Sequence, residues 1–311
     1  MASILLNVLK RVVLGGDRDG AAAAGSHGEL PEFGTLKLKR CRYGWMLFDG
    51  PFIGKCFELY GEYSESEVAL MRAYLREGDT VLDIGANIGD LTLPLARMVG
   101  ASGLVYAIES HARAFNVMCG NLALNEIANV QPINAFVGRR ETAENSGLQA
   151  ARALDTQWGG LSYVSEKLPP PMLPVDELDL PDCRLIKIDV DGSELDILKS
   201  AQQTIERCRP VLYFENDSPA NSPALISHCW DQDYDLYWHL APICGPDNYS
   251  NNPVNAWAPV NVLSLMVLGL PRESGLAAPE GLSRIATSRE WPMQETEEAA
   301  RQLAENGLLE S

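Results

Sequence analysis

Three ionisable side chains alternate with apolar ones in a short segment of the chain. Lys187, Asp189 and Asp191 are each separated by one apolar residue, so a strand over 185–190 would place them on one face. Charges on a buried central strand are costly unless they are paired. Ligands bind at the carboxyl ends of parallel strands. We therefore expect Asp189 to act as general base or to hydrogen-bond a reacting hydroxyl, with Lys187 in the same catalytic group. A purely structural contact between the two is the alternative.

Two further groups could serve the same chemistry. His239 ends a later apolar segment and titrates near neutral pH, so it could take a proton from an acceptor; a structural histidine is the alternative. Asp189, Asp191 and Glu215 could instead hold a hard divalent cation through their oxygen atoms. We assign no metal ligands and keep the divalent cation as the weaker reading.

A glycine-containing loop joins an apolar strand to a helix over residues 80–90. Gly85 lets the chain turn, and Gly89 lets the helix start close to the strand or to a ligand. A dinucleotide site usually has glycine where Asn87 stands, and Asp83 would repel a pyrophosphate. The ammonium and sulfonium groups of S-adenosylmethionine suit that carboxylate, although it could simply hydrogen-bond the loop. We expect Asp83, Gly85, Asn87 and Gly89 to bind S-adenosylmethionine.

The rest of that ligand would extend over the next two strands. Glu109 ends the strand 104–108, about 20 residues beyond the glycine loop, where a carboxylate can accept hydrogen bonds from both ribose hydroxyls. Ser110 follows it, and Phe136 lies where an adenine ring would sit. We expect all three to contact the ligand. The alternatives are a helix cap for Glu109 and a core position for Phe136.

Strands and helices alternate through the middle of the chain, which predicts an α/β fold with a mostly parallel sheet and helices on both faces. The last two strands have no helical pattern between them, which suggests an antiparallel pair at one edge. The expected strands are 80–84, 104–108, 130–136, 185–190, 211–214, 236–239 and 262–268, and the expected helices are 64–76, 90–98, 112–125, 194–207 and 220–231.

We divide the chain into a flexible extension over 1–32, a catalytic domain over 33–271 and an acidic tail with a helix over 272–311. Residues 1–14 suggest an amphipathic helix, or a loose membrane-surface attachment, and 15–28 a Gly/Ala-rich linker. Alternation over 36–60 predicts short antiparallel strands. Ser64 and Glu67 have the spacing of a capping box for the helix that follows.

Composition limits the partners. The net charge of -17 disfavours nucleic acid and anionic membranes. Seven scattered cysteines with no C-x-x-C spacing argue against a disulfide framework or structural zinc and favour the cytoplasm. No apolar run is long enough to predict an integral membrane segment. A homodimer remains open.

The acceptor side is expected in a long segment after the sixth strand. Residues 241–259 are rich in Asn, Pro and aromatic residues, and Tyr249 and Trp257 offer stacking faces beside amide donors. Such a loop suits a small-molecule or glycan acceptor.

Several of these segments resemble the FkbM family of methyltransferases. The similar segments are Asp83–Gly89, Asn121–Asn125, Trp158–Ser162, Pro174–Leu178 and Leu185–Gly192, and the resemblance covers about 60–270. The family usually has Glu where Asp191 stands, and the extension to Phe33 has no family signature.

The resemblance implies a Rossmann-like class I methyltransferase fold, with a mostly parallel seven-stranded sheet and an antiparallel edge strand. It also implies S-adenosylmethionine-dependent methylation of a hydroxyl on a sugar, glycolipid or similar small molecule. An NAD-linked oxidoreductase and a non-catalytic binding protein of the same fold are the alternatives.

Overall fold

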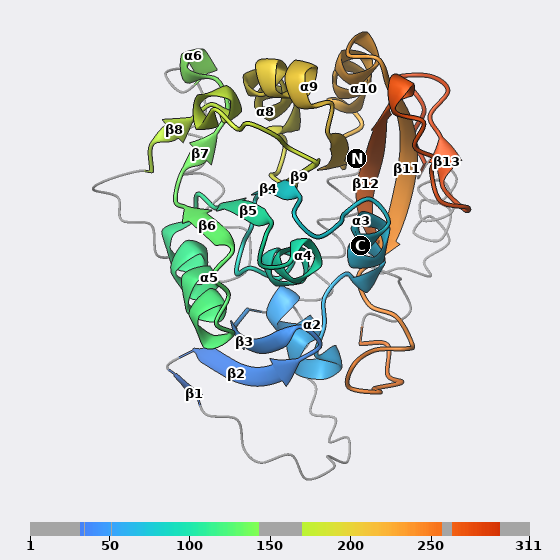
Figure 1. Cartoon of the computed structure of the whole chain (residues 1–311). Coiled ribbons are helices and arrows are strands. Elements are labelled where there is room, and N and C mark those ends of the chain that lie inside the picture. Colours follow the sequence, from blue (N-terminus) through green and yellow to red (C-terminus); the bar gives the residue numbers. More distant parts are fainter. Residues whose placement is uncertain (1–31, 34, 51, 143–169, 257–262, 293–311) are drawn as a thin grey trace.

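A twisted sheet of eight strands forms the centre of the computed structural model, which describes residues 32–33, 35–50, 52–142, 170–256 and 263–292 (Figure 1). The strands are β1 (Glu32–Phe33), β2 (Leu36–Cys41), β3 (Gly44–Phe48), β4 (Thr80–Ile84), β5 (Leu104–Ile108), β6 (Val130–Ile133), β7 (Phe136–Val137), β8 (Met172–Leu173), β9 (Leu185–Ile188), β10 (Val211–Glu215), β11 (Tyr234–Pro242), β12 (Leu263–Pro271) and β13 (Ser283–Arg284). The α-helices are α2 (Ile53–Tyr60), α3 (Glu65–Arg72), α4 (Thr92–Val99), α5 (Ala112–Leu124), α6 (Arg140–Thr142), α8 (Glu194–Ser200), α9 (Gln202–Cys208) and α10 (Ser222–Asp231).

The sheet order confirms a mostly parallel α/β fold. It runs β13-β11-β12-β10-β9-β4-β5-β6, and β10, β9, β4, β5 and β6 are mutually parallel. The predicted antiparallel pair is confirmed as β11 and β12, but neither strand lies at the edge of the sheet. β12 lies between β10 and β11 and is antiparallel to both, and β13 adds a further strand outside β11. Inserting β12 there buries it between two strands, as its apolar sequence requires.

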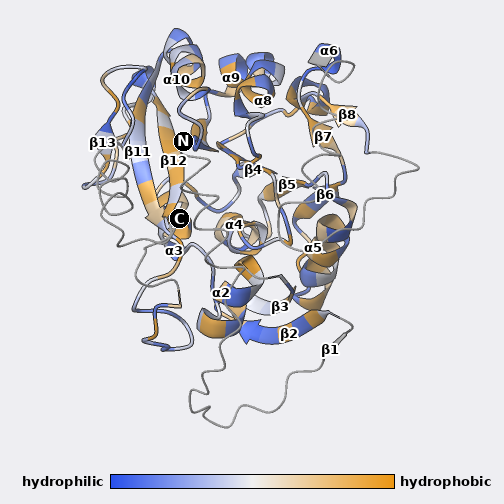
Figure 2. Cartoon of the chain, turned by 180° about the vertical axis from the view of Figure 1, so that it is seen from behind, coloured by the Kyte–Doolittle hydropathy of each residue, from blue (hydrophilic) through white to orange (hydrophobic). Residues whose placement is uncertain are grey.

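Helices cover both faces of the sheet (Figure 1). α8, α9 and α10 pack on one face through Ile197, Ile205 and Leu225, and α3 and α4 pack on the other through Val68 and Leu95. Figure 2 shows apolar residues concentrated on the central strands and on the inward faces of these helices. The two faces of the sheet therefore have separate apolar cores.

The chain before α3 forms a cover over α5. β2 and β3 pair as the predicted antiparallel hairpin. The predicted strand over 53–60 is wrong, because these residues form α2. Ile53, Cys56, Phe57 and Tyr60 are spaced by three and four residues, which places them on one helical face that packs inward.

Local differences from the predicted helices have simple causes. Ser64 has a left-handed backbone and makes no capping bond to α3; its hydroxyl donates to Glu67 Oε1 at 2.5 Å instead. The predicted helix 194–207 is broken at Ala201. Asp176 caps the second half, accepting hydrogen bonds from the Gln203 and Thr204 backbone N–H groups. The segments 1–14, 15–28 and Trp158–Ser162, the predicted stacking residue Trp257 and the tail beyond 292 lie outside the described residues.

Two of the scattered cysteines meet in the fold. Cys56 on α2 and Cys244 after β11 place their Sγ atoms 3.2 Å apart. They join α2 to the segment that follows β11, which also donates the Ser250 N–H to the Tyr60 carbonyl. In the part of the chain that the structure describes, no helix is long and apolar enough to cross a membrane.

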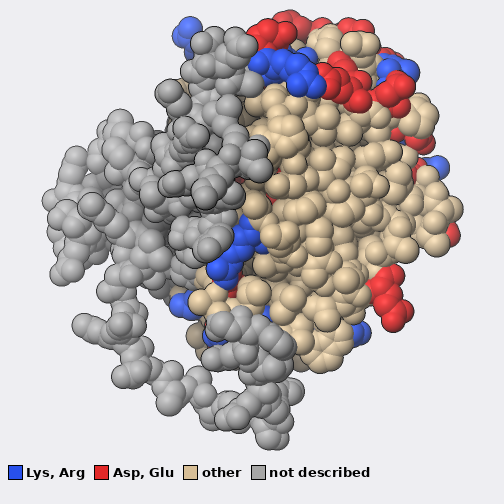
Figure 3. All heavy atoms as spheres, turned by 90° about the vertical axis from the view of Figure 1, so that its left-hand side faces the viewer, with Lys and Arg blue, Asp and Glu red and all other residues tan. Residues whose placement is uncertain are grey.

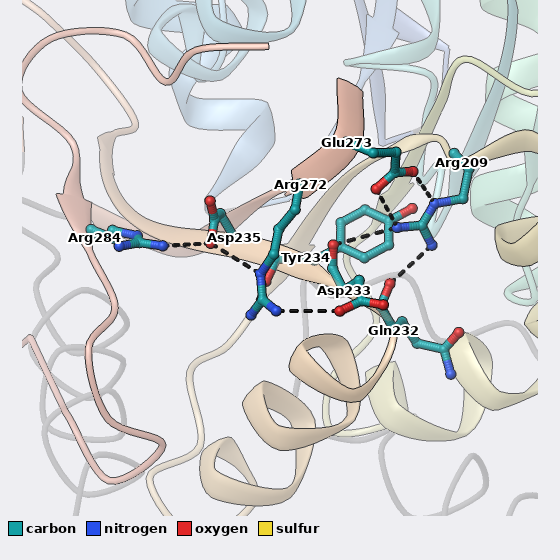
Figure 4. A network of polar contacts seen from close by, with 8 residues as sticks. All are labelled: Arg209, Gln232, Asp233, Tyr234, Asp235, Arg272, Glu273 and Arg284. Atoms are coloured by element: carbon teal, nitrogen blue, oxygen red, sulfur yellow. Dashed lines mark hydrogen bonds and ion pairs between the residues drawn. The ribbon is translucent and has the colours of Figure 1, made fainter. Parts of the chain in front are cut away.

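Charged groups cluster at the end of the sheet where β11 begins (Figure 4). Arg272 lies 3.3 Å from both Asp233 and Asp235, and Arg209 pairs with Glu273 while covering the Tyr234 ring. These exposed pairs contribute little stability each, but they fasten the end of β12 to β11. Figure 3 shows another face, where Lys and Arg mix with Asp and Glu along the upper rim, so neither sign dominates its visible part.

Candidate active site

Lys187 stands at the centre of the candidate site. Its side chain is 2% exposed, and its Nζ lies 3.1 Å from Asp83 Oδ1 and 3.6 Å from Asp189 Oδ2. It also donates a 3.0 Å hydrogen bond to the Gly85 carbonyl oxygen. Because Asp83 and Lys187 are cross-strand partners on β4 and β9, the sheet register sets this contact. This burial and these contacts suit a positioning role, and the predicted catalytic role of Lys187 stays a prediction.

Asp83 lies beneath the turn and is closed off from solvent. Its side chain is fully buried, and its second oxygen accepts a 2.7 Å hydrogen bond from the Thr92 hydroxyl. Its charge is therefore matched by Lys187 before any ligand arrives. The predicted direct contact of Asp83 with a ligand does not fit this conformation. The alternative of a bond to the loop N–H groups does not fit either.

The turn itself has the backbone that its glycines predict. Gly85, Asn87 and Gly89 all have positive φ values, +77°, +48° and +85°. A Cβ at Gly85 would overlap the Asp189 carbonyl oxygen, so the turn passes directly against the end of β9. Only glycine allows both this approach and this φ. The turn therefore brings the carboxyl ends of β4 and β9 together.

Glu109 holds the turn from the neighbouring strand. Its carboxylate accepts hydrogen bonds from the Asn87 N–H at 2.8 Å and from the His111 N–H at 2.7 Å. Burial raises its pKa above the ordinary value, and these two hydrogen bonds offset only part of that rise. The Asn134 side chain donates to the carbonyl oxygens of Glu109 and Ser110, which joins the loops after β5 and β6. Asn134 is not among the residues predicted from the sequence.

Phe136 occupies a different element from the one predicted. β6 ends at Ile133, and Phe136 begins β7, which pairs with β8. The Phe136 side chain is half-buried. Phe136 follows the end of β6 closely, so it remains near the carboxyl ends of the parallel strands, where Glu109 and the turn lie.

Three acidic or phenolic groups join this cluster from outside the predicted set. Glu67 on α3 is 1% exposed. Burial, followed by the charge of Asp189, raises its pKa to about 7. Burial also raises the pKa of Asp90, to about 7, and the Lys187 ammonium partly offsets this. Tyr63 lies among Asp189, Glu67 and Asp90, which together with burial raise its pKa.

His239 lies apart from Asp189. His239 lies on β11 and Asp189 directly follows β9, and β12 and β10 lie between these two strands, so the two backbones are roughly 14 Å apart. His239 Nδ1 is 2.8 Å from the Tyr213 hydroxyl, and burial lowers its pKa. The structure thus does not bring the two predicted proton acceptors together.

Three carboxylates meet beside β10, in a set that differs from the predicted one. Asp191, Glu215 and Asp217 offer oxygen atoms within 4.8 Å of one another, and Asp189 is not among them. Burial, followed by the surrounding acids, raises the pKa of Glu215 well above its ordinary value. Carboxylate oxygens suit a hard cation, but exposed acidic groups also gather without one.

Glu109 offers a direct test of the ligand side. We expect Glu109→Gln to weaken S-adenosylmethionine binding about tenfold, because one acceptor oxygen for the ribose and the turn is lost. Isothermal titration calorimetry measures this. Glu126→Gln, an exposed change just after α5, is the control and should leave the affinity unchanged. Equal affinities for Glu109→Gln and the unchanged protein would refute the ribose assignment.

Comparisons with known proteins agree with this geometry. Residues 83–235 match the family model described as Methyltransferase FkbM domain. A 59-residue stretch is 44% identical to a tRNA(Phe) (4-demethylwyosine(37)-C(7)) aminocarboxypropyltransferase of Methanocaldococcus jannaschii, covering 19% of this chain and 23% of that protein. A 50-residue stretch is 40% identical to a probable cobalt-precorrin-6B C(15)-methyltransferase of Saccharolobus solfataricus, covering 16% and 25%. The chain thus matches about a quarter of the length of either relative.

Solved structures give weaker likenesses. The FkbM methyltransferase of Methylobacillus flagellatus is 18% identical with a TM-score of 0.43, over 69% of this chain and 50% of that one. The precorrin-6y C5,15-methyltransferase of Geobacter metallireducens is 13% identical with a TM-score of 0.43, over 66% and 87%. The family match spans β4 to the start of β11 and includes the turn, Glu109 and the Lys187 cluster. Residues 83–235 therefore form a methyltransferase domain of the FkbM family.

Proposed function

We propose that this methyltransferase transfers its methyl group to a hydroxyl of a small sugar-containing acceptor. The observation that carries the proposal is the Asp189 carboxylate, which is 37% exposed at the carboxyl end of β9 while the buried Lys187 holds it from behind. A carboxylate fixed in this way can accept a hydrogen bond from a hydroxyl and then take its proton.

Residues of the turn and of β5 would hold the donor. The backbone of Gly85 to Gly89 supports it, Glu109 accepts from its ribose, and Ser110 and Phe136 flank the nucleoside. When bound, S-adenosylmethionine supplies an activated methyl group. The protein then has two tasks, which are to align the acceptor oxygen with that methyl and to receive the proton.

The segment after β11 supports a polar acceptor with flat faces. Tyr249 is 42% exposed, and its N–H donates to the buried Glu62 carboxylate, which fixes the backbone beneath the ring. Asn248 holds the neighbouring backbone by accepting from the Asn252 N–H. An exposed aromatic ring on an ordered loop is a surface on which a sugar ring can stack.

Labelled S-adenosylmethionine incubated with a pool of glycans and glycolipids tests the proposal. We expect mass spectrometry to find a labelled methyl ether on a sugar hydroxyl. Parallel incubations contain tRNA and tetrapyrroles, the compound classes named for the two curated relatives. Label only in the tRNA or tetrapyrrole arm would overturn the proposal.

Asp189→Asn is the matched variant for this assay. We expect turnover to fall by about 100-fold or more, because the amide cannot accept the proton. Binding of S-adenosylmethionine, measured by calorimetry, should remain. Unchanged turnover would remove Asp189 from the mechanism.

A further inference from the structure

We propose that Glu67 and Asp90 make the site prefer the cationic methyl donor to its neutral product, S-adenosylhomocysteine. This goes beyond the acceptor proposed above and rests only on the placement of the donor over the turn. Glu67 lies on α3, outside the matched family domain, and Asp90 follows the turn directly.

Among the described residues, carboxylates outnumber the positive charge at Lys187. Four carboxylates act on its ammonium, those of Asp83, Asp189, Asp90 and Glu67. Although burial alone would lower the pKa of Lys187, these four raise it above its ordinary value. Within the described part of the chain, Lys187 is the cation they share, so the cluster is strongly negative when all four are ionised.

The carboxylates around Lys187 differ in how closely they are partnered. Asp83 has Lys187 at 3.1 Å and the Thr92 hydroxyl at 2.7 Å. The buried Oδ1 of Asp90 finds no hydrogen-bond donor among the described residues. Glu67 accepts from the neutral Ser64 hydroxyl. Burial raises the pKa of each of these two acids to about 7, and Lys187, which they share with Asp83 and Asp189, offsets only part of that rise.

The positive charge of the donor would lie near these carboxylates. With its ribose at Glu109 on β5 and its adenine toward β6, its methionine end must extend across β4 toward β9, because the sheet order is β9-β4-β5-β6. The turn touches β9 at Asp189, and Lys187 binds the Gly85 carbonyl from below. The sulfonium would then lie over the excess of carboxylates.

The groups that face Glu67 and Asp90 are those whose charges can influence the pH dependence of ligand binding. The groups facing Glu67 are Ser64, Ser264, Tyr63, Tyr213 on β10, Lys187 on β9 and Asp189 just after it. Facing Asp90 are Lys187, Asp83, Asp189 and Tyr63. Above pH 7 Glu67 and Asp90 are ionised and attract a sulfonium; below pH 7 they are protonated and do not. The neutral thioether of the product gains nothing from either state.

Calorimetric titration of both ligands at pH 6.0 and 8.5 tests this. The ratio of the product Kd to the donor Kd cancels the amino and carboxyl groups that the two ligands share. We expect this ratio to rise about tenfold between the two pH values, from Coulomb attraction at short range. Donor binding near pH 7 should also release protons, seen as heats that differ between buffers of different ionisation enthalpy.

Matched variants identify the groups responsible. In Glu67→Gln the rise should shrink several-fold, and Asp90→Asn provides a second, independent variant. Glu65→Gln is the control, because Glu65 lies two residues away on the same helix but pairs with Arg42 and Tyr43. A pH-independent ratio in the unchanged protein, or a full rise in both variants, would overturn the proposal. Failure of both ligands to bind at any pH would instead overturn the donor placement itself.

Discussion

Replacing Asp83 by alanine is expected to lower the free energy of unfolding by about 3 kcal/mol. The change leaves the ammonium of Lys187 buried without its closest carboxylate, and Asp189, which remains 3.6 Å away, is partly in solvent. Chemical denaturation followed by circular dichroism measures the loss. Asp231→Ala, at an exposed aspartate that ends α10, is the control and should change the stability by less than about 0.5 kcal/mol.

A double variant separates lost pairing from lost packing. If the partners act through their charges, Asp83→Ala combined with Lys187→Met should be less destabilised than the sum of the single changes, by about 1–3 kcal/mol. A methionine fills the space of the lysine stem and carries no charge to leave unpaired. Strictly additive losses would show that the ion pair contributes no coupling, and the central role of Lys187 would have to be abandoned.

Gly85→Ala is expected to be at least as damaging, for a steric reason. The new Cβ would overlap the Asp189 carbonyl oxygen while the backbone keeps a φ of +77°. We expect a loss of about 3 kcal/mol or more, together with at least about a tenfold loss of S-adenosylmethionine affinity as the turn moves away from β9.

Gly192 supplies a matched control, because its φ is also +77° and a Cβ there would meet nothing closer than Asn221 Nδ2 at 3.9 Å. Gly192→Ala should therefore show only the cost of the left-handed backbone, about 1–2 kcal/mol. The difference between the two variants isolates the overlap with Asp189. Equal losses would mean that the approach of the turn to β9 is not tight in solution.

The sequence was sufficient to place the turn and most of the strands that carry the site. β4 and β5 have the predicted bounds, because short and largely apolar segments between turn residues leave few alternatives. The same local signals could not show that Glu67 faces Asp189, since these residues come from elements far apart in the chain. The S-x-x-E spacing that suggested a helix cap for Glu67 is equally compatible with a buried acid held by Ser64.

Other errors arose from tertiary arrangement. Local periodicity predicts strands but not the order in which they pair. The sequence pattern therefore did not indicate that β12 lies between β10 and β11, which places His239 far from Asp189. Cys56 and Cys244 likewise meet only because the segment after β11 returns to α2. One signal was present and overlooked, which is the three- and four-residue spacing from Ile53 to Tyr60 that marks a helix.

β3 is an edge strand of the cover over α5, and two asparagine side chains form hydrogen bonds with its backbone. Asn121 accepts from the Leu47 N–H and donates to its carbonyl, and Asn125 does the same for Trp45. The two asparagines, one helical turn apart, thus bind alternate residues of β3 as a neighbouring strand would. An open strand edge is a template on which another chain can add and aggregate. Because α5 already satisfies these groups on β3, Asn121→Ala and Asn125→Ala would expose an adhesive edge as well as loosen the cover.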